Sequence, residues 1–226
     1  MTIGRRPFRP LRLAHRGDWR RAPENTLPAL LAALEVPACD GLEFDVRVSG
    51  DGVPIVLHDE TLSRVQGSLE RADALTADVL GEYGVPTLAE VLAAVPHGAF
   101  LDVELKGDHG RAVVEVLAAG RGAGLTNAVV SSFDRETLER VAGLAPSWPR
   151  WLNTVDLTPS TVAAARDLGC QGVAAEWRAI NAGSADRARA AGLDIAAWTV
   201  RRRATFHRLA GLGVVAVCVE AAALDG

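Results

Sequence analysis

Residues 41–46 read Gly-Leu-Glu-Phe-Asp-Val, and residues 101–106 read Leu-Asp-Val-Glu-Leu-Lys. In both stretches apolar and charged residues alternate with a period of two, which is the period of a β-strand whose two faces meet different surroundings. We expect the apolar face of each strand to pack outward against helices and the charged face to point into the interior of a closed sheet. An unpaired charge in such an interior costs several kcal/mol, so groups of opposite charge must meet there.

Outward from these two stretches, short β-branched or apolar runs alternate with longer segments of helical spacing, which is the pattern of repeated βα units around a parallel sheet. The length of 226 residues fits one barrel of this kind. A doubly wound open sheet is the competing architecture, but it would be favoured by a glycine-rich turn after the first strand, where this chain has His-Arg-Gly-Asp. We therefore predict an α/β protein, a (β/α)₈ TIM barrel with strands near 11–14, 42–48, 100–105, 128–131, 150–153, 172–175, 194–198 and 214–219, and helices near 26–35, 87–95, 111–122, 135–143, 160–168, 184–191 and 202–210.

One stretch, residues 53–85, does not fit a simple βα repeat. It begins with a short apolar run that ends at His58 and continues as a polar stretch with a weak helical signal. We interpret it as an insertion on the barrel rim between strand two and helix two. The chain has no recognisable linker, low-complexity tract or longer repeat, so we expect residues 1–226 to form a single domain.

Composition narrows the classes of partner and the compartment. The chain is 49% apolar and 23% charged with a formal net charge of -4, so no polycationic surface for nucleic acid is expected. Cys39, Cys170 and Cys218 are widely scattered and contain no C-x-x-C pair, which indicates reduced thiols. No apolar run has the length of a signal-peptide core or a membrane span, so we expect a cytoplasmic protein without a membrane segment.

Inward-pointing carboxylates gather on the second and third strands. Glu43 and Asp45 share one face of the second strand, and Glu104 lies on the corresponding face of the third. Three such carboxylates suit a hard, oxygen-preferring divalent ion, either Mg²⁺ or Ca²⁺. The alternative is a buried ion-pair network in which Lys106 is the partner.

Two histidines stand at strand ends. His15 closes the first strand and His58 closes the short strand of the insertion. Catalytic groups in a (β/α)₈ barrel lie at the carboxyl ends of the strands, and an imidazole that titrates near neutrality can both accept and donate a proton. A lone histidine is more often structural, but these two have carboxylates nearby in the expected topology.

Several short motifs occur together in this chain. They are His-Arg-Gly at 15–17, Pro-Glu-Asn-Thr at 23–26, Glu-Phe-Asp at 43–45, Val-Pro-Ile-Val-Leu-His-Asp at 53–59, Asp-Val-Glu-Leu-Lys at 102–106, Ser-Phe-Asp at 132–134 and Ala-Trp-Thr-Val at 197–200. In this order and spacing they resemble the glycerophosphodiester phosphodiesterase family.

The resemblance implies a metal-dependent phosphoric diester hydrolase that converts a small-molecule glycerophosphodiester to glycerol 3-phosphate and an alcohol. It leaves open whether the nucleophile is water or the free glycerol hydroxyl beside the phosphate, which would first give a cyclic diester. It implies that His15 and His58 are the general acid/base pair, that Glu43, Asp45 and Glu104 bind the metal, that Arg16 and Lys106 contact the phosphate, that Glu24 lies in the first βα loop beside the metal and the catalytic histidine, and that Trp198 forms part of the apolar wall for the alcohol group.

Two other functions stay open. A lysophospholipase D-type enzyme would need an apolar groove or an exposed hydrophobic loop, and a non-catalytic phosphoester-binding barrel would be expected to lack a histidine or a metal carboxylate.

The chain departs from the family pattern in three places. Arg64 is followed by valine and glutamine where threonines are common. Arg201 opens a basic cluster that is either a solvated helix start or a site for an anionic headgroup, and the last strand ends in Val219 and Glu220 where threonine and aspartate are usual.

Overall fold

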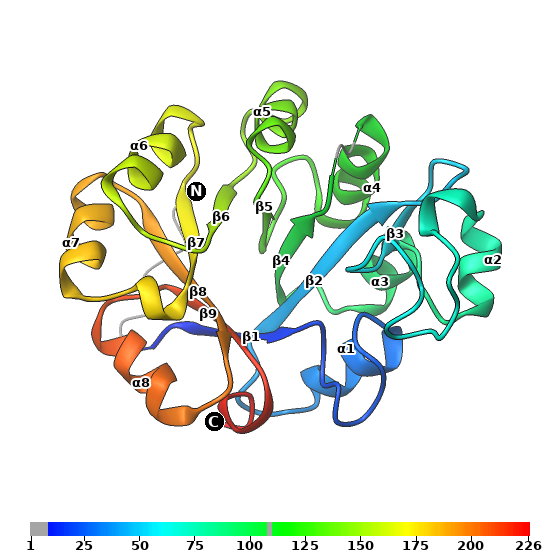
Figure 1. The fold of residues 1–226 in the computed structure, drawn as a ribbon, viewed down its shortest axis with the longest axis horizontal. Coiled ribbons are helices and arrows are strands. Elements are labelled where there is room, and N and C mark those ends of the chain that lie inside the picture. Colours follow the sequence, from blue (N-terminus) through cyan, green and yellow to red (C-terminus); the bar gives the residue numbers. More distant parts are fainter. Residues whose placement is uncertain (1–8, 108–109) are drawn as a thin grey trace.

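The computed structural model describes residues 9–107 and 110–226; residues 1–8 and 108–109, which the expected single domain includes, lie outside the described residues. In the described part, parallel strands run side by side in the order β1, β9, β8, β7, β6, β5, β4, β2, and a further pairing of β1 with β2 closes them into a barrel (Figure 1). The predicted (β/α)₈ barrel is thus confirmed. Its strands are β1 (Leu11–His15), β2 (Gly41–Val48), β4 (Phe100–Leu105), β5 (Ala128–Ser132), β6 (Arg150–Thr154), β7 (Gly172–Glu176), β8 (Asp194–Val200) and β9 (Ala216–Val219).

Helices follow the strands and surround the barrel (Figure 1). Threonine caps set two of their starts: the Thr26 hydroxyl accepts a hydrogen bond from the first turn of α1, and Thr87 and Glu90 form a reciprocal capping box at α3. The helices are α1 (Leu27–Leu34), α3 (Leu88–Ala94), α4 (Arg111–Arg121), α5 (Arg135–Leu144), α6 (Pro159–Asp167), α7 (Ala182–Ala190) and α8 (Arg203–Gly211), close to the predicted bounds.

The last strand starts later than predicted. We expected it to begin at 214, but β9 begins at Ala216, which is where its register with β1 starts. Val215 instead donates a backbone hydrogen bond to Ile195 from outside the strand. Its carbonyl also accepts a hydrogen bond from the Leu11 amide, so the backbone contacts to both neighbouring strands begin one residue before the strand itself.

The rim segment, residues 53–85, has more structure than the sequence indicated. Strand β3 (Pro54–Val56) pairs antiparallel with the end of β2, and a 3₁₀ turn (Ala72–Ala74) and helix α2 (Ala77–Glu82) follow. The weak helical signal thus corresponds to a real but short helix. The segment is held by an apolar cluster of its own, made of Ile55, Leu57, Leu62, Ala72, Ala77, Leu80 and Val85.

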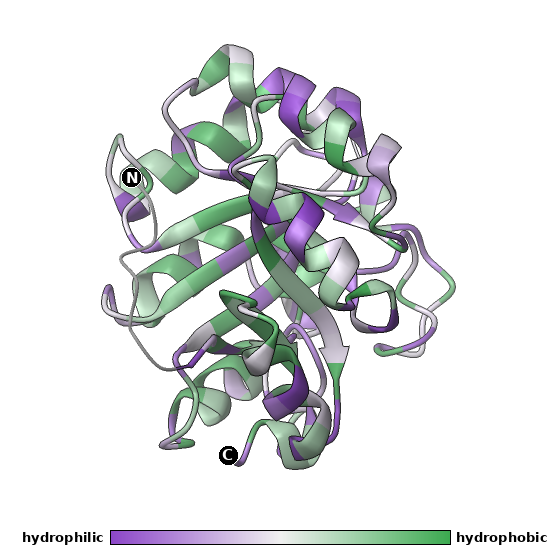
Figure 2. Cartoon of the chain, turned by 90° about the vertical axis from the view of Figure 1, so that its left-hand side faces the viewer, coloured by the Kyte–Doolittle hydropathy of each residue, from purple (hydrophilic) through white to green (hydrophobic). Residues whose placement is uncertain are grey.

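The barrel wall separates an apolar shell from a partly polar interior. Leu42, Phe44 and Val46 of β2 are fully buried in the main apolar cluster between strands and helices, and Figure 2 shows hydrophobic residues along the strands. A smaller apolar cluster contributed by several strands fills part of the barrel interior. The carboxylates of β2 and β4 alternate with the outward apolar residues, as the period of two predicts, so they face inward.

Among the helices of the described ranges, none is long and apolar enough to cross a membrane. All three cysteines of the chain are free thiols.

Candidate active site

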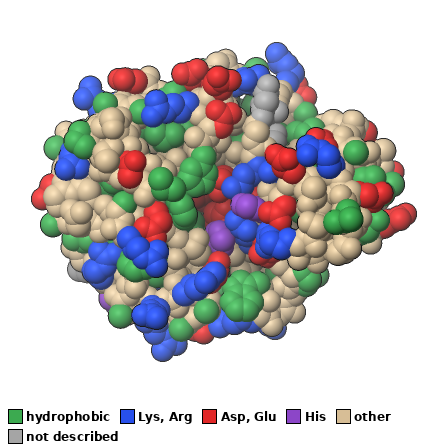
Figure 3. All heavy atoms as spheres, viewed as in Figure 1, with side chains coloured by type: hydrophobic (Ala, Val, Ile, Leu, Met, Phe, Trp, Pro, Cys, Tyr) green, Lys and Arg blue, Asp and Glu red, His purple; other side chains and the backbone are tan. Residues whose placement is uncertain are grey.

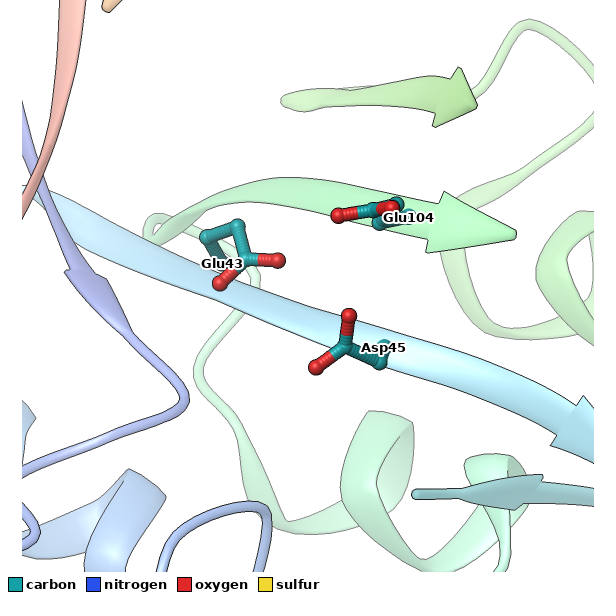
Figure 4. Close-up of side chains that lie close together, drawn as sticks. All are labelled: Glu43, Asp45 and Glu104. Atoms are coloured by element: carbon teal, nitrogen blue, oxygen red, sulfur yellow. The ribbon is translucent and has the colours of Figure 1, made fainter. Parts of the chain in front are cut away.

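The carboxylates predicted to bind a metal lie together. In the register of β2 and β4, Asp45 is paired with Glu104, and Glu43 precedes Asp45 by two residues on the same face. Each of the three side chains offers an oxygen, and these oxygens lie within 4.8 Å of one another (Figure 4). All three residues are buried. Adjacent strands therefore aim three carboxylates into one small volume.

Cations meet these carboxylates from two sides. The Lys106 ammonium lies 3.1 Å from Oδ1 of Asp45 and also contacts Glu104. Nε of Arg16 lies 3.0 Å from Oδ2 of Asp45. Burial raises the pKa of the Asp45 carboxyl, but Arg16 and Lys106 outweigh this effect and hold the pKa below its ordinary value. The ion-pair network considered from the sequence is thus present, built around Asp45.

The network leaves Glu43 without such a partner. Burial, together with repulsion from Asp45 and Glu104, raises the pKa of the Glu43 carboxyl well above its ordinary value. Among the described residues, Oε2 of Glu43 has no hydrogen-bond donor. The ionised form of such a buried carboxyl is favoured only when a cation lies beside it, so the donor set fits a divalent ion that prefers oxygen ligands.

His15 is held by a carboxylate from the last strand end. Its Nδ1 lies 2.7 Å from Oε1 of Glu220, while its Nε2 lies 3.8 Å from Oε2 of Glu43. Arg201 donates from Nε to the other Glu220 oxygen at 2.7 Å. Burial raises the pKa of Glu220, but His15 and Arg201 outweigh it and lower the pKa to about 2. An ionised Glu220 accepts a hydrogen bond from Nδ1–H of His15, so that Nε2 faces the carboxylates.

His58 has a similar arrangement at the other side of the site. Its Nδ1 lies 2.6 Å from Oδ1 of Asp59, and Arg64 donates to the second Asp59 oxygen at 2.6 Å. Burial lowers the pKa of His58, although Asp45 and Asp59 act in the opposite direction. The net effect lowers the pKa of His58, which favours the neutral imidazole, and Nδ1 is directed at a carboxylate.

The His-Arg-Gly turn after β1 places Arg16. Arg16 and Gly17 both have positive φ, at 58° and 87°. A Cβ at position 17 would lie 2.5 Å from the Ala29 backbone carbon, so only glycine allows the chain to pass α1 this closely. The turn directs the Arg16 guanidinium to Asp45 and also to Glu24, which it contacts at 2.8 Å.

The Pro-Glu-Asn-Thr motif has two roles that the sequence did not separate. Thr26 caps α1 through its side-chain hydroxyl. Asn25 does not cap the helix through its side chain in this way: its amide Nδ2 donates to Oδ2 of Asp45 at 2.9 Å. Glu24 accepts from Arg16 and from Arg64, which ties the first βα loop to the rim segment.

These groups surround a cavity of about 230 Å³ at the carboxyl ends of the strands. Figure 3 shows histidine side chains in this hollow, with acidic side chains beside them and hydrophobic side chains on one flank. Phe133 and Trp198 meet edge to face there, with ring centroids 5.4 Å apart. The cavity is lined by His15, Arg16, Glu43, His58, Asp102, Glu104, Lys106, Phe133, Asn153, Ala174, Trp198, Thr199 and Cys218.

Comparison with known proteins identifies the relatives of this chain. The model of the glycerophosphoryl diester phosphodiesterase family matches residues 15–224. The chain belongs to this family. A glycerophosphodiester phosphodiesterase of Bacillus subtilis (strain 168) is 29% identical over 245 aligned residues, which cover 93% of this chain and 83% of that protein. One from Caldanaerobacter subterraneus subsp. tengcongensis is 33% identical over 163 residues, which cover 62% of this chain and 64% of that protein's length.

Solved structures agree with the barrel. An Oleispira antarctica phosphodiesterase in complex with the product sn-glycerol-3-phosphate has a TM-score of 0.84 and 28% identity, over 93% of this chain and 92% of that one. A glycerophosphodiester phosphodiesterase from Agrobacterium tumefaciens str. C58 has a TM-score of 0.83 and 25% identity, over 96% and 98% of the two chains. As a member of the glycerophosphoryl diester phosphodiesterase family, the chain is a phosphoric diester hydrolase.

Most of the site residues expected from the sequence line the cavity. Their individual roles stay predictions. Asp45 lies beneath it, fully buried, and Glu24 stands outside it between two arginines. The sequence alone did not single out Glu220, Asp59 or Asn25. Asp59 and Asn25 lie inside recognised motifs, so their neighbours along the chain were a usable signal, whereas Glu220 had only its place after the last strand.

Proposed function

We propose that the chain hydrolyses glycerophosphodiesters of small alcohols to glycerol 3-phosphate and the alcohol, in a reaction that depends on Mg²⁺ or Ca²⁺ and uses His15 and His58 as acid and base. The observation that carries the proposal is the pairing of each histidine's Nδ1 with a carboxylate, at 2.7 Å for His15 and 2.6 Å for His58. Both rings line one cavity that also contains buried carboxylates, a lysine and an arginine.

The charged residues would bind and orient the diester. Glu43, Asp45 and Glu104 would hold the divalent ion, which supplies a Lewis acid for a non-bridging phosphoryl oxygen. Lys106 and Arg16 line the same cavity, and their positive charges would stabilise the charge that builds up on the phosphoryl oxygens in the transition state. Asn25 would keep Asp45 in place through its amide hydrogen bond.

The two histidines would divide the proton transfers. Because burial lowers the pKa of His58, its neutral ring is suited to accept a proton from the nucleophile. His15 lies against the ionised Glu220, whose charge stabilises the protonated ring that must donate to the departing alcohol. Each carboxylate partner also fixes which ring nitrogen faces the cavity.

The dimensions of the cavity favour a small substrate. Its volume of about 230 Å³ is below the roughly 300–1,000 Å³ of sites that enclose drug-sized ligands. Phe133 and Trp198 offer an apolar wall, but their aromatic pair is short compared with an acyl chain. This supports a headgroup-sized alcohol over the lysophospholipid alternative. The free state of all three cysteines supports the further proposal that the reaction takes place in the cytoplasm.

The test is turnover of glycerophosphocholine and lysophosphatidylcholine by the purified protein, in EDTA and after addition of Mg²⁺ or Ca²⁺. We expect ion-dependent release of glycerol 3-phosphate from the first substrate, and a loss of about 10²- to 10⁴-fold in His15→Ala and His58→Ala. His207→Ala, on the outer helix α8, serves as the matched control and should keep full activity.

Two other outcomes of this assay would each indicate another function. Turnover restricted to lysophosphatidylcholine would identify a lysophospholipase D-type enzyme. Binding of glycerol 3-phosphate without ion-dependent turnover of either diester would identify a non-catalytic phosphoester-binding barrel.

A further inference from the structure

Arg64 of the rim segment is hydrogen-bonded to two carboxylates from different parts of the chain. Its Nε lies 2.6 Å from Oδ2 of Asp59, and the other oxygen of Asp59 holds the His58 ring. Its Nη2 lies 2.7 Å from Oε1 of Glu24, an oxygen that Nη1 of Arg16 also approaches, at 2.8 Å. One guanidinium thus links the carboxylate that holds the proposed base to the carboxylate that holds the proposed phosphate contact.

These links continue to the carboxylate cluster. Nε of Arg16 lies 3.0 Å from Oδ2 of Asp45, so the side chains from Asp59 to Asp45 alternate in charge without a gap. Burial raises the pKa of Glu24, but Arg64 and Arg16 outweigh this effect and hold the pKa below its ordinary value. Glu24 is therefore favoured in the ionised form, which can accept from both arginines at once.

The rim segment presents Arg64 to the first βα loop. Residues 61–71 turn back on themselves, and the Leu62 amide donates to the Glu70 carbonyl across this turn. Arg64 lies within the turn, and its side chain reaches out of it to Glu24, 40 residues earlier in the chain. The contact with Glu24 therefore sets the position of the turn relative to the first βα loop.

Stability alone does not account for these ion pairs. The Arg64 side chain is 47% exposed, and ion pairs of such exposed groups contribute little to the stability of a fold. Arg71 offers a direct comparison on the same segment. It is 52% exposed and also joins two carboxylates, Glu60 and Asp73, but neither of these holds a residue of the site in the described part of the chain. What distinguishes Arg64 is the pair of residues that its carboxylates hold.

We propose that Arg64 is a positioning residue that holds His58 and Arg16 in register with each other, through Asp59 and Glu24. A guanidinium suits this task because its donors form a rigid planar fork, whereas an ammonium group is a point charge. The inference rests on the proposed function, since it takes His58 to be the base and Arg16 to contact the phosphate. Proton transfer needs such a fixed relative position, because a displacement of about 1 Å can lower the rate of a reaction by about two orders of magnitude.

The first experiment measures kcat and KM for glycerophosphocholine, with Mg²⁺ present, in Arg64→Met. This change keeps most of the aliphatic stem and removes the fork. We expect kcat to fall roughly tenfold because His58 loses its fixed orientation, and KM to rise roughly three- to tenfold because Arg16 loses its own. Arg71→Met is the matched control and should keep both constants, while the two variants should have the same Tm.

A double variant tests whether the two effects share one link. Glu24→Gln breaks the chain at the carboxylate next to Arg64, so adding it to Arg64→Met should raise KM no further than the larger of the two single changes does. Increases in KM that multiply in the double variant would show two independent contacts and would overturn the proposal.

Arg64→Lys keeps the test decisive if Arg64→Met does not fold. An ammonium group can approach one of the two carboxylates but does not reproduce the fork, so the lysine variant should restore kcat or KM but not both. The proposal is overturned if Arg64→Lys equals the wild type in both constants, if Arg64→Met behaves as Arg71→Met, or if Arg64→Met lowers kcat with KM unchanged.

A measurement that needs no turnover separates this proposal from the proposed function. The ¹⁵N shifts of the His58 ring report which nitrogen carries the proton, and we expect the Nδ1–H form in the wild type and a mixture of both forms in Arg64→Met. The same tautomer in the two proteins would overturn the positioning role. A change of tautomer in a protein that hydrolyses no diester would leave the positioning of His58 standing and remove the proposed hydrolysis.

Discussion

Glu220 lies 205 residues from His15 along the chain, and closure of the barrel brings the two side chains within 2.7 Å. Glu220 contacts neither the carboxylate cluster nor the cavity, so we interpret it as a positioning residue for His15. Its second oxygen is held by Arg201, the first residue of the basic cluster. The two departures from the family pattern at Arg201 and Glu220 therefore form one ion pair, and at least the first arginine of that cluster has a structural partner.

The first prediction concerns the charge of this residue. In Glu220→Gln a hydrogen-bond acceptor for Nδ1 of His15 is kept, but the negative charge that stabilises the protonated ring is lost. We expect kcat to fall roughly tenfold, which is the difference between a charge-assisted and a neutral hydrogen bond, and the alkaline limb of the kcat–pH profile to move to lower pH. Steady-state kinetics across pH measure both effects.

Two further variants separate positioning from folding. Glu220→Asp keeps the charge and should restore the wild-type pH profile. Glu176→Gln alters a glutamate that also ends a barrel strand and pairs with an arginine, Arg178, but that has no histidine partner among the described residues. It should leave the profile unchanged. A pH profile in Glu220→Gln identical to that of the wild type would show that the residue has no part in proton transfer.

Single residues also show where sequence reasoning reached its limit. Asn25 and Asp59 lie in motifs, but their partners Asp45 and His58 follow only from the path of the loops after β1 and β3. Glu220 was noted only as a departure, because nothing local indicates that the end of β9 faces the end of β1. Contacts of this kind depend on the register in which the last strand closes the barrel, and that register is a property of the folded chain.

At the scale of the element, β4 combines what is easy and what is hard to predict. Its alternation identified the strand, its inward face and Glu104, because a period of two can be recognised from neighbouring residues alone. It did not indicate a difference between Glu104 and Asp102, which lie on the same face. In the structure Asp102 is buried, lines the cavity and accepts a hydrogen bond from the Ser131 hydroxyl of the next strand. The rim helix α2 was indistinct in the sequence for a different reason: its six residues are too few for a clear helical period.

The second prediction follows from the burial of Asp102. Burial, reinforced by the charges of Glu104 and Asp45, raises the pKa of Asp102 to about 7, although its hydrogen bond from Ser131 opposes the shift. The pKa in the folded state thus lies above that in the unfolded state, so the folded protein retains a proton that the unfolded chain has released. Stability contributed by this group is complete below about pH 4 and is lost as the pH rises to about 7.

Asp102→Asn removes this titration and keeps an acceptor for Ser131. Between pH 5 and pH 8 the free energy of unfolding in EDTA should fall by about 3 kcal/mol more in the wild type than in the variant, at 1.36 kcal/mol per pKa unit. Urea denaturation at several pH values measures this difference. Asp186→Asn on the outer helix α7 is the control, since that carboxylate is exposed and paired with Arg189. If the free energy of unfolding depended on pH in the same way in the wild type and in Asp102→Asn, Asp102 would have the same protonation in the folded and the unfolded state.

For the whole molecule, the carboxylate cluster that would serve the function lowers the stability of the fold. β2 and β4 bring Glu43, Asp45 and Glu104 together in a buried volume, where Lys106 and Arg16 oppose their charges. The raised pKa of Glu43 records the unfavourable energy of that arrangement. A divalent ion bound there would relieve this repulsion, so we expect the ion to stabilise the barrel.

The third prediction concerns the Tm of the protein with and without a divalent ion. Mg²⁺ or Ca²⁺ should raise the Tm of the wild-type protein relative to EDTA, because an ion bound to the folded state alone adds about 2.7 kcal/mol of stability at one hundred times its Kd. Glu43→Gln should have a higher Tm than the wild type in EDTA, since the repulsion is gone, and should gain little or nothing from the ion. Glu139→Gln, an exposed change on α5, should behave as the wild type in both conditions. If Glu43→Gln instead lowers the Tm in EDTA and keeps the full response to the ion, Glu43 is a structural ion-pair residue and the ion binds elsewhere. The sign of the effect in EDTA therefore decides between the two interpretations of the buried carboxylates that the sequence left open.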